Sequence, residues 1–239
     1  MRHSLIVKLI VFLLLYPLSF NFAFSKNIDN HLLSSHLETI LNQRNHILLK
    51  DLFLQKSLSQ FNQQYLDFSK KYKDSKWLIK TLSNYQNKIL LDINITSSRE
   101  IGDQFYNLYT TQIVEIETFK NKIKSYKVIT EESILNSQDS PLIIKIIAPD
   151  KVLTGERYEI NLIIESPLDN SLIASGIIIL KNKDNMNIRN DLFEIKPNQS
   201  GGLFKYIQAP LRPGSQTISA IITHPEGIYS ITKKIKVGL

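Results

Sequence analysis

The chain has 239 residues, of which 43% are hydrophobic and 21% charged, a composition typical of one large or two small globular domains. It contains no cysteine, which excludes disulfides, zinc–thiolate sites, iron–sulfur ligation and cysteine nucleophiles. The formal net charge is +7. Because the basic residues are spread along the chain rather than concentrated in one segment, we expect no nucleic-acid partner.

Residues 1–25 have the three parts of a secretory signal peptide. Arg2 and Lys8 give a positive start, residues 9–15 are an unbroken apolar run, and small residues precede a cleavage site after Ser25. We therefore expect an exported protein, periplasmic or extracellular, or in the thylakoid lumen if the source is photosynthetic. The alternative is an uncleaved segment that anchors the chain in a membrane at its N-terminus.

Residues 26–130 are expected to form an antiparallel helical bundle or a coiled-coil hairpin. No glycine or proline occurs from Lys26 to Ile101, which is typical of long helices. Apolar residues also recur at alternating spacings of three and four, interrupted at Arg44 and Asp51. The residues on this repeat are Leu37, Ile40, Ile47, Leu54, Leu58, Phe61, Tyr65, Phe68 and Tyr72.

Two further helices are expected after a loop or kink at the polar residues 70–76. The first runs from about Ser75 to Asn94. The next begins at Ser97, which forms a capping box with Glu100. Three helices with short connections predict the bundle.

The apolar period changes from 3.6 to 2 after a polar, acidic linker at residues 131–140. In Tyr158–Glu165 the even positions are apolar, as expected for a half-buried antiparallel strand. The last strand, 228–237, alternates in the same way, with Lys233 as its one break. About seven strands with regular turn signals are expected in residues 141–239.

This C-terminal pattern resembles the disulfide-free immunoglobulin-like or fibronectin-III-like β-sandwiches of bacterial exported proteins. The stretch TGERYEINL enters the second strand, and RPGSQTISAIITHPEGIYSI has a Pro–Gly corner followed by strand, turn and strand. The predicted fold class is thus a helical bundle followed by an antiparallel β-sandwich. The resemblance carries no catalytic residues.

Several stretches of the sequence resemble catalytic or binding motifs, but their structural context does not favour such a role. Gly201 and Gly202 precede a strand and not a helix, so they do not form a phosphate loop. Ser230 and Lys233 match SxxK but lie in an alternating strand, where their side chains point to opposite faces. The spacings between His31, His36 and His46 do not favour a metal site. We expect no catalytic residue, cofactor or metal.

The densest basic patch is a group of five lysines near the end of the first helical segment. It is a candidate contact for an anionic membrane surface, with a solvated helix end as the alternative. Its members are Lys70, Lys71, Lys73, Lys76 and Lys80.

By elimination, the sequence favours an exported, non-enzymatic interaction or scaffold protein of the bacterial cell envelope. Its partner would be a protein or an envelope component, with no small-molecule substrate. One alternative is a periplasmic chaperone or assembly factor, which predicts an exposed apolar groove or cavity between the two halves. Others are peripheral binding of anionic membranes through Lys70–Lys80 and an enzyme with an unrecognised site, which needs a pocket of convergent polar groups.

Overall fold

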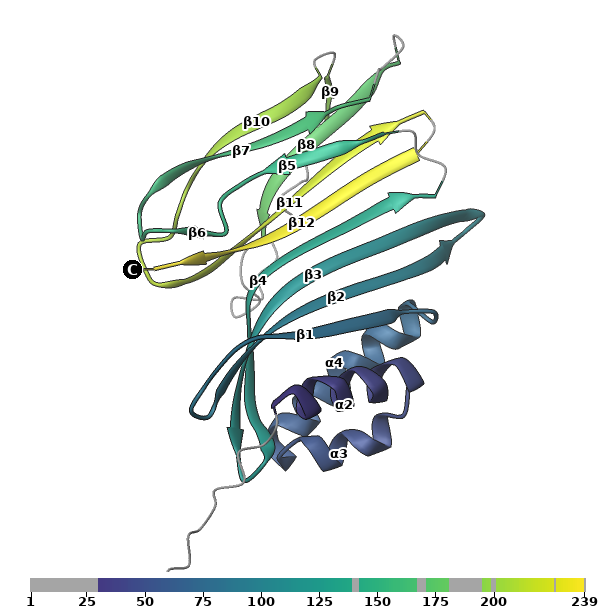
Figure 1. Cartoon of the computed structure of the whole chain (residues 1–239). Coiled ribbons are helices and arrows are strands. Elements are labelled where there is room, and N and C mark those ends of the chain that lie inside the picture. Colours follow the sequence, from purple (N-terminus) through teal and green to yellow (C-terminus); the bar gives the residue numbers. More distant parts are fainter. Residues whose placement is uncertain are drawn as a thin grey trace, which may run out of the picture.

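The computed structural model describes residues 30–138, 142–166, 171–180, 195–198, 201–225 and 227–238. The expected signal peptide, residues 1–25, lies outside this part. The described protein is mostly antiparallel β-sheet, with a short helical segment at its N-terminal end (Figure 1).

The helices fill only the first part of the segment expected to be helical. They are α2 (Asn30–Gln43), the 3-10 turn η1 (His46–Leu48), α3 (Leu49–Leu52) and α4 (Gln55–Lys71). Arg44, one of the two interruptions seen in the apolar repeat, follows α2 with a φ of 56° and ends it. The polar stretch after Lys71 ends α4, as expected.

Four long strands follow where helices were expected, so the predicted helical bundle is wrong. They form an antiparallel meander of β1 (Lys76–Tyr85), β2 (Lys88–Ile101), β3 (Gln104–Phe119) and β4 (Lys122–Ser137). The expected second helix covers β1 and the start of β2, and the expected capping box at Ser97 lies inside β2.

The physical reason is that this segment satisfies a period of two better than one of 3.6. In β2 the residues Ile89, Leu91, Ile93 and Ile95 are buried in turn, each flanked by a more exposed neighbour. The hairpins turn at residues with positive φ, which are Gln86, Gly102, Lys120 and Asn121. Only one of them is a glycine and none is a proline, so the usual turn residues do not mark these hairpins in the sequence.

The C-terminal region forms a two-layer β-sandwich, as predicted. Its strands are β5 (Ile144–Ile147), β6 (Lys151–Val152), β7 (Arg157–Ile164), β8 (Ile173–Leu180), β9 (Lys196–Asn198), β10 (Gly202–Gln208), β11 (Gly214–His224) and β12 (Gly227–Val237). One layer is the three-stranded sheet β10–β7–β5, and the other contains β12, β11, β8 and β9. Fully buried side chains such as Ile160, Leu162, Ile173 and Ile235 fill the space between them.

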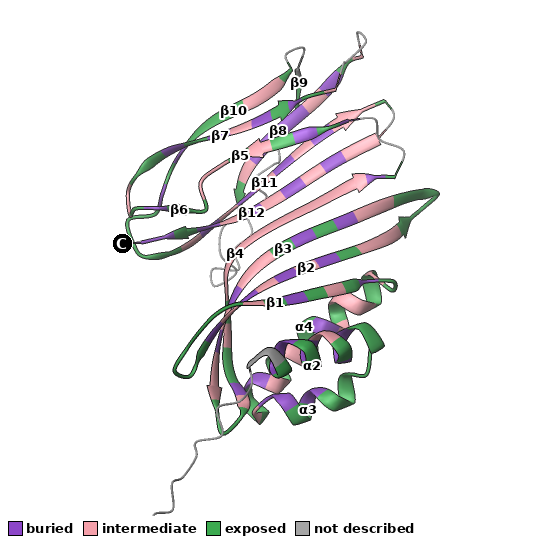
Figure 2. Ribbon diagram, in the orientation of Figure 1, coloured by how far each residue is buried: buried purple, intermediate pink, exposed green. Residues whose placement is uncertain are grey.

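The two halves share one sheet and are not separated by a linker. β4 pairs with β12, so the meander and one sandwich layer form a sheet in the order β1–β2–β3–β4–β12–β11–β8–β9 (Figure 1). Residues 131–137, expected to belong to a linker, are the end of β4. Figure 2 shows intermediate burial along this part of β4, where it passes between the two halves.

The two hydrophobic cores lie against opposite faces of the shared sheet. Tyr229 and Ile231 of β12 face the sandwich core. Thr232, between Ile231 and Lys233, faces the helices instead, on the same side as Ser133 of β4. The helices therefore cover one face of the shared sheet, and the three-stranded layer of the sandwich covers the opposite face.

Lys233, the break in the alternation of β12, lies on the sandwich face at the joint of the two halves. Its Nζ is 3.0 Å from Glu132 Oε2 on β4 and 2.9 Å from Asp150 Oδ1 in the β5–β6 connection. Burial lowers the pKa of Lys233, but hydrogen bonds to Asp150 and Glu132 outweigh it and raise the pKa above its usual value. The charged side chain is tolerated on the face that carries the core because both carboxylates pair with it.

Side chains of α2 cover the open edge of β1. The Asn42 amide donates to the Trp77 carbonyl at 2.9 Å and its oxygen accepts from the Trp77 N–H at 2.8 Å. Glu38 Oε2 accepts from the Ile79 N–H at 2.7 Å. These bonds replace those of a neighbouring strand, so the edge is not free to pair with another chain there.

Candidate functional site

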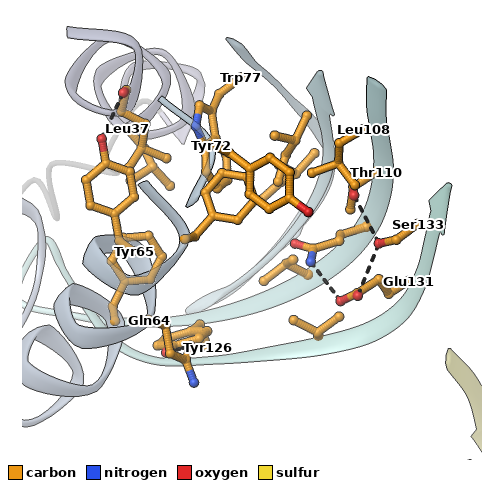
Figure 3. A pocket seen from close by; sticks show the side chains of 18 of the residues that line it. Leu37, Gln64, Tyr65, Tyr72, Trp77, Leu108, Thr110, Tyr126, Glu131 and Ser133 are labelled. Carbon is orange, nitrogen blue, oxygen red and sulfur yellow. Dashed lines mark hydrogen bonds between the residues drawn. The ribbon is translucent and has the colours of Figure 1, made fainter. Parts of the chain in front are cut away.

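A pocket of about 430 Å³ lies between α4 and the shared sheet (Figure 3). Helix α4 crosses the sheet from the start of β4, where Ser57 Oγ donates to the Ile123 carbonyl, to Trp77 at the start of β1. The lining comes from helices, from all four meander strands and from β12. It consists of Leu37, Leu41, Phe53, Phe61, Gln64, Tyr65, Phe68, Tyr72, Trp77, Ile93, Ile95, Leu108, Thr110, Gln112, Val114, Ile116, Tyr126, Val128, Glu131, Ser133 and Thr232.

Aromatic rings form the helix side of this pocket. They pack on one another, which fixes their positions. The nearest pairs, by ring centroid, are Phe53–Phe61 at 4.7 Å, Phe68–Tyr72 at 4.9 Å, Phe61–Tyr126 at 5.5 Å and Phe68–Trp77 at 5.6 Å. The buried Tyr65 hydroxyl donates to the Leu41 carbonyl at 3.0 Å and ties α4 to α2.

One bridge spans the pocket from helix to sheet. The Tyr126 hydroxyl on β4 donates to Gln64 Oε1 on α4 at 2.7 Å. Burial raises the pKa of Tyr126, so this hydroxyl keeps its proton throughout the physiological pH range. The bridge holds the middle of α4 against β4.

The sheet side of the pocket carries a small polar cluster among apolar residues. The Gln112 amide donates to Glu131 Oε2 at 2.8 Å, Thr110 donates to Ser133 at 2.9 Å, and Ser133 donates to Glu131 Oε1 at 3.3 Å. Figure 3 shows Thr110, Ser133 and Glu131 side by side on this wall. Both carboxylate oxygens are thus occupied by neighbours from β3 and β4.

Two polar groups at the aromatic side are unused within the described residues. The indole N–H of Trp77 is buried without a hydrogen-bond partner. The Tyr72 hydroxyl points toward the wall that carries Thr110 and Ser133 (Figure 3) and makes no hydrogen bond with any described residue. Of the two, the Tyr72 hydroxyl faces the pocket and can donate to an oxygen atom of a guest, whereas the indole N–H is enclosed by protein.

A cation lies beside the end of the pocket that Tyr72 closes. Arg99 is on the pocket-facing side of β2, opposite Tyr106, and its guanidinium carbon is 5.8 Å from the Tyr72 ring centroid. No hydrogen bond or ion pair to another described residue engages this guanidinium.

Asp74 anchors the loop that presents Tyr72. Its carboxylate accepts hydrogen bonds from the Ser97 hydroxyl at 2.8 Å, the Ser98 N–H at 3.0 Å and the Ser98 hydroxyl. These bonds, above all that from the Ser98 hydroxyl, lower the pKa of Asp74 to about 2. The acid nearest in sequence to Tyr72 is therefore used to hold the loop on β2.

The five lysines singled out from the sequence are all exposed, but they divide between two places. Lys70 and Lys71 end α4, and Lys73 follows Tyr72, so these three flank the end of the pocket. Lys76 and Lys80 lie on β1 opposite Thr96 and Asp92, on the sheet face away from the pocket. Lys70 is 3.8 Å from Asp67, an exposed ion pair.

The other motifs weighed in the sequence lie apart from the pocket. Ser230 and Lys233 occupy opposite faces of β12, as predicted. Gly202 enters the edge strand β10, where a Cβ would lie 2.5 Å from the Leu162 carbonyl oxygen. Within the described ranges, no three histidine, aspartate or glutamate side chains converge as metal ligands do. None of the described helices is long and apolar enough to cross a bilayer.

Sequence reasoning missed the pocket because its lining comes from segments far apart in the chain, and the four meander strands among them were predicted as helices. The aromatic residues of α4 were predicted only as members of an apolar helical repeat. The alternation from Ile89 to Ile95 was the signal that would have placed β2 beneath them.

A family model described as a domain of unknown function (DUF8623) matches residues 139–238, which is the β-sandwich alone. No curated protein matches this sequence. The helical layer, the meander and all of the pocket lining except Thr232 lie outside the matched segment.

Proposed function

We propose that the protein is an exported, non-enzymatic binding protein that holds an apolar or amphipathic guest between α4 and the shared sheet. The observation that carries this proposal is the pocket itself. Its volume of about 430 Å³ falls in the range of ligand sites, and its wall is mostly aromatic and aliphatic with a few polar groups. The guest belongs to the envelope of the cell, in keeping with the signal peptide expected at residues 1–25.

The arrangement of the polar side chains favours binding over catalysis. Glu131 accepts hydrogen bonds from Gln112 and Ser133, and Thr110 donates to Ser133, so the cluster satisfies itself. Such a network fixes the shape of the wall and positions polar groups for recognition. A general base or nucleophile instead needs a partner that activates it toward a substrate.

We further propose that the C-terminal region is an immunoglobulin-like sandwich that supports the pocket and offers a second surface to a protein partner. Its strand order favours this assignment. With β5, β7, β8, β9, β10, β11 and β12 counted in that order, one layer has the first, second and fifth strands and the other has the third, fourth, sixth and seventh. The layer with β12 continues directly into the pocket wall through Thr232.

A chaperone-like role is the second candidate, and the open side of the pocket favours it. That role requires an apolar groove able to take a side chain or a short apolar segment of a client. The rim residues Phe61, Phe68 and Tyr126 are partly exposed, so they can contact a guest without unfolding of the helices.

The proposal is tested with the environment-sensitive dye N-phenylnaphthylamine. The wild-type protein is expected to bind it saturably with enhanced fluorescence. Val128→Phe adds a ring to the pocket wall and should weaken this binding at least tenfold, because the added volume displaces the dye.

The matched control is Thr130→Phe, two residues along the same strand. Thr130 pairs with Ile113, on the face of the sheet away from the pocket, whereas Val128 pairs with Val114 on the pocket face. The control should bind the dye as the wild type does. Equal binding by the wild type and Val128→Phe would refute the proposed site.

A further inference from the structure

We infer that the guest is a single-chain anionic amphiphile, with its chain in the aromatic pocket and its anionic head against Arg99 at the end closed by Tyr72. This inference rests on the proposed function and adds the chemistry of the head group. It is argued from the charges around that end of the pocket.

The first observation is the position of Arg99. It lies on the same face of β2 as Ile93 and Ile95, which line the pocket. It pairs with Tyr106 of β3, two residues from the pocket-lining Leu108. Its guanidinium carbon is 5.8 Å from the Tyr72 ring centroid, so the partly buried side chain is held beside the pocket end. An arginine fork in this position is suited to bind a carboxylate or a phosphate.

The second observation is that the acid nearest in sequence to Tyr72 is engaged elsewhere. Asp74 accepts three hydrogen bonds from Ser97 and Ser98. Within the described residues no carboxylate lies within 4.0 Å of Arg99. The cation is therefore available to an external anion.

The third observation is the surrounding positive charge. Lys71 and Lys73 flank Tyr72 directly in the chain, and both are exposed. Together with Arg99 they place three positive charges at this end, which favour an anionic guest. At the opposite end the pocket is bounded by apolar side chains such as Phe53 and Ile116, which suit the end of an alkyl chain.

The test measures displacement of N-phenylnaphthylamine by three amphiphiles with the same chain: dodecanoate, dodecanol and dodecyltrimethylammonium. We expect dodecanoate to bind about tenfold more tightly than dodecanol, with the ammonium compound weakest, because a hydrogen bond to a charged group adds to the chain contribution. Shorter carboxylates should lose about fourfold per methylene removed.

Arg99→Gln should abolish the preference for dodecanoate over dodecanol and leave the affinity for dodecanol unchanged. Arg99→Lys should restore part of the preference, which separates loss of charge from misfolding. Arg157→Gln is the matched control, since this arginine also lies over a tyrosine ring, Tyr206, at 4.8 Å but in the sandwich. It should keep the full preference, and all variants should keep the wild-type circular dichroism spectrum.

The outcomes separate the two proposals. If Arg99→Gln keeps the preference, or if no amphiphile displaces the dye while Val128→Phe weakens dye binding, the anionic amphiphile is refuted and the pocket function stands. If Val128→Phe binds the dye as tightly as the wild type does, both proposals are refuted.

Discussion

The ion pairs of Lys233 test whether the two halves are joined as one structure. The side chain of Lys233 is 11% exposed, whereas those of its partners Glu132 and Asp150 are 36% and 74% exposed. The two N–O distances are nearly equal, at 3.0 and 2.9 Å. The distances alone therefore predict equal coupling free energies for the two ion pairs, whereas the exposure of the partners predicts unequal ones.

We expect exposure to decide. The pair with Glu132 lies in the range between a surface and a buried ion pair, so its coupling free energy should be about 1.5 kcal/mol. The pair with the highly exposed Asp150 should contribute about 0.5 kcal/mol or less. At molar salt, where charges are screened within about 3 Å, the coupling to Asp150 should disappear first.

The assay is a pair of double-mutant cycles in urea unfolding, followed by far-UV circular dichroism. Lys233→Met keeps the apolar stem of the side chain, and it is combined with Glu132→Gln or Asp150→Asn. Lys234→Met is the control, because Lys234 points to the opposite face and donates to the Val128 carbonyl at 2.9 Å. A coupling to Asp150 equal to or larger than that to Glu132 would refute the reasoning, as would two couplings below about 0.3 kcal/mol.

Three further predictions concern stability and association. Gly202→Ala should destabilise the protein by about 1–3 kcal/mol in urea unfolding, because its Cβ would lie 2.5 Å from the Leu162 carbonyl oxygen; an unchanged midpoint would contradict this close approach. Asn42→Leu should lower the free energy of unfolding by about 1–2 kcal/mol, because both backbone groups of Trp77 lose their partner. It should also expose the edge of β1 and give dimers in sedimentation velocity, and a strictly monomeric variant would argue against protection of that edge by Asn42. Asp74 has a folded pKa lowered from 3.8 to about 2, so its contribution is present above about pH 4 and is lost as the pH falls toward 2. Because this carboxyl is largely exposed, the difference between wild type and Asp74→Asn should be about 1 kcal/mol or less at neutral pH, and it should vanish in acid unfolding curves near pH 2.

The sequence predicted the ends of the molecule better than its middle. Helical structure was predicted up to about Lys71, because the amphipathic repeat of α4 is long and ends in a polar stretch, but as one helix and not as the separate α2, α3 and α4. The sandwich strands were found because alternation and Pro–Gly turns coincide there, as in β7 and β12.

The middle was misread because the absence of glycine and proline was taken as a sign of helix. Residues 76–137 carry few breakers, since their hairpins turn at residues such as Gln86 and Asn121 with positive φ. Several apolar residues in this segment fit both periods, and only their burial pattern selects the strand. Pairing of β4 with β12 is a contact between distant segments that no local pattern reports.

The candidate site was out of reach for the same reason. Its walls come from α2, α4, four strands of the meander and β12, and only tertiary structure brings them together. The lysine cluster was a partial signal, because Lys70, Lys71 and Lys73 flank the pocket end, but Lys76 and Lys80 lie on the far face of β1. Arg99, the residue that the charge argument selects, lay within an assumed helix.

The most direct test of the central claim uses Trp77, the only tryptophan in the chain, which lines the pocket. Its fluorescence is measured during titration with an alkyl carboxylate brominated at the middle of its chain, since bromine quenches tryptophan only at contact. The account predicts saturable quenching of the wild type, strongly reduced quenching of Val128→Phe, and no change for Thr130→Phe. Absence of saturable quenching, or equal quenching of Val128→Phe and wild type, would contradict a guest site between α4 and the sheet.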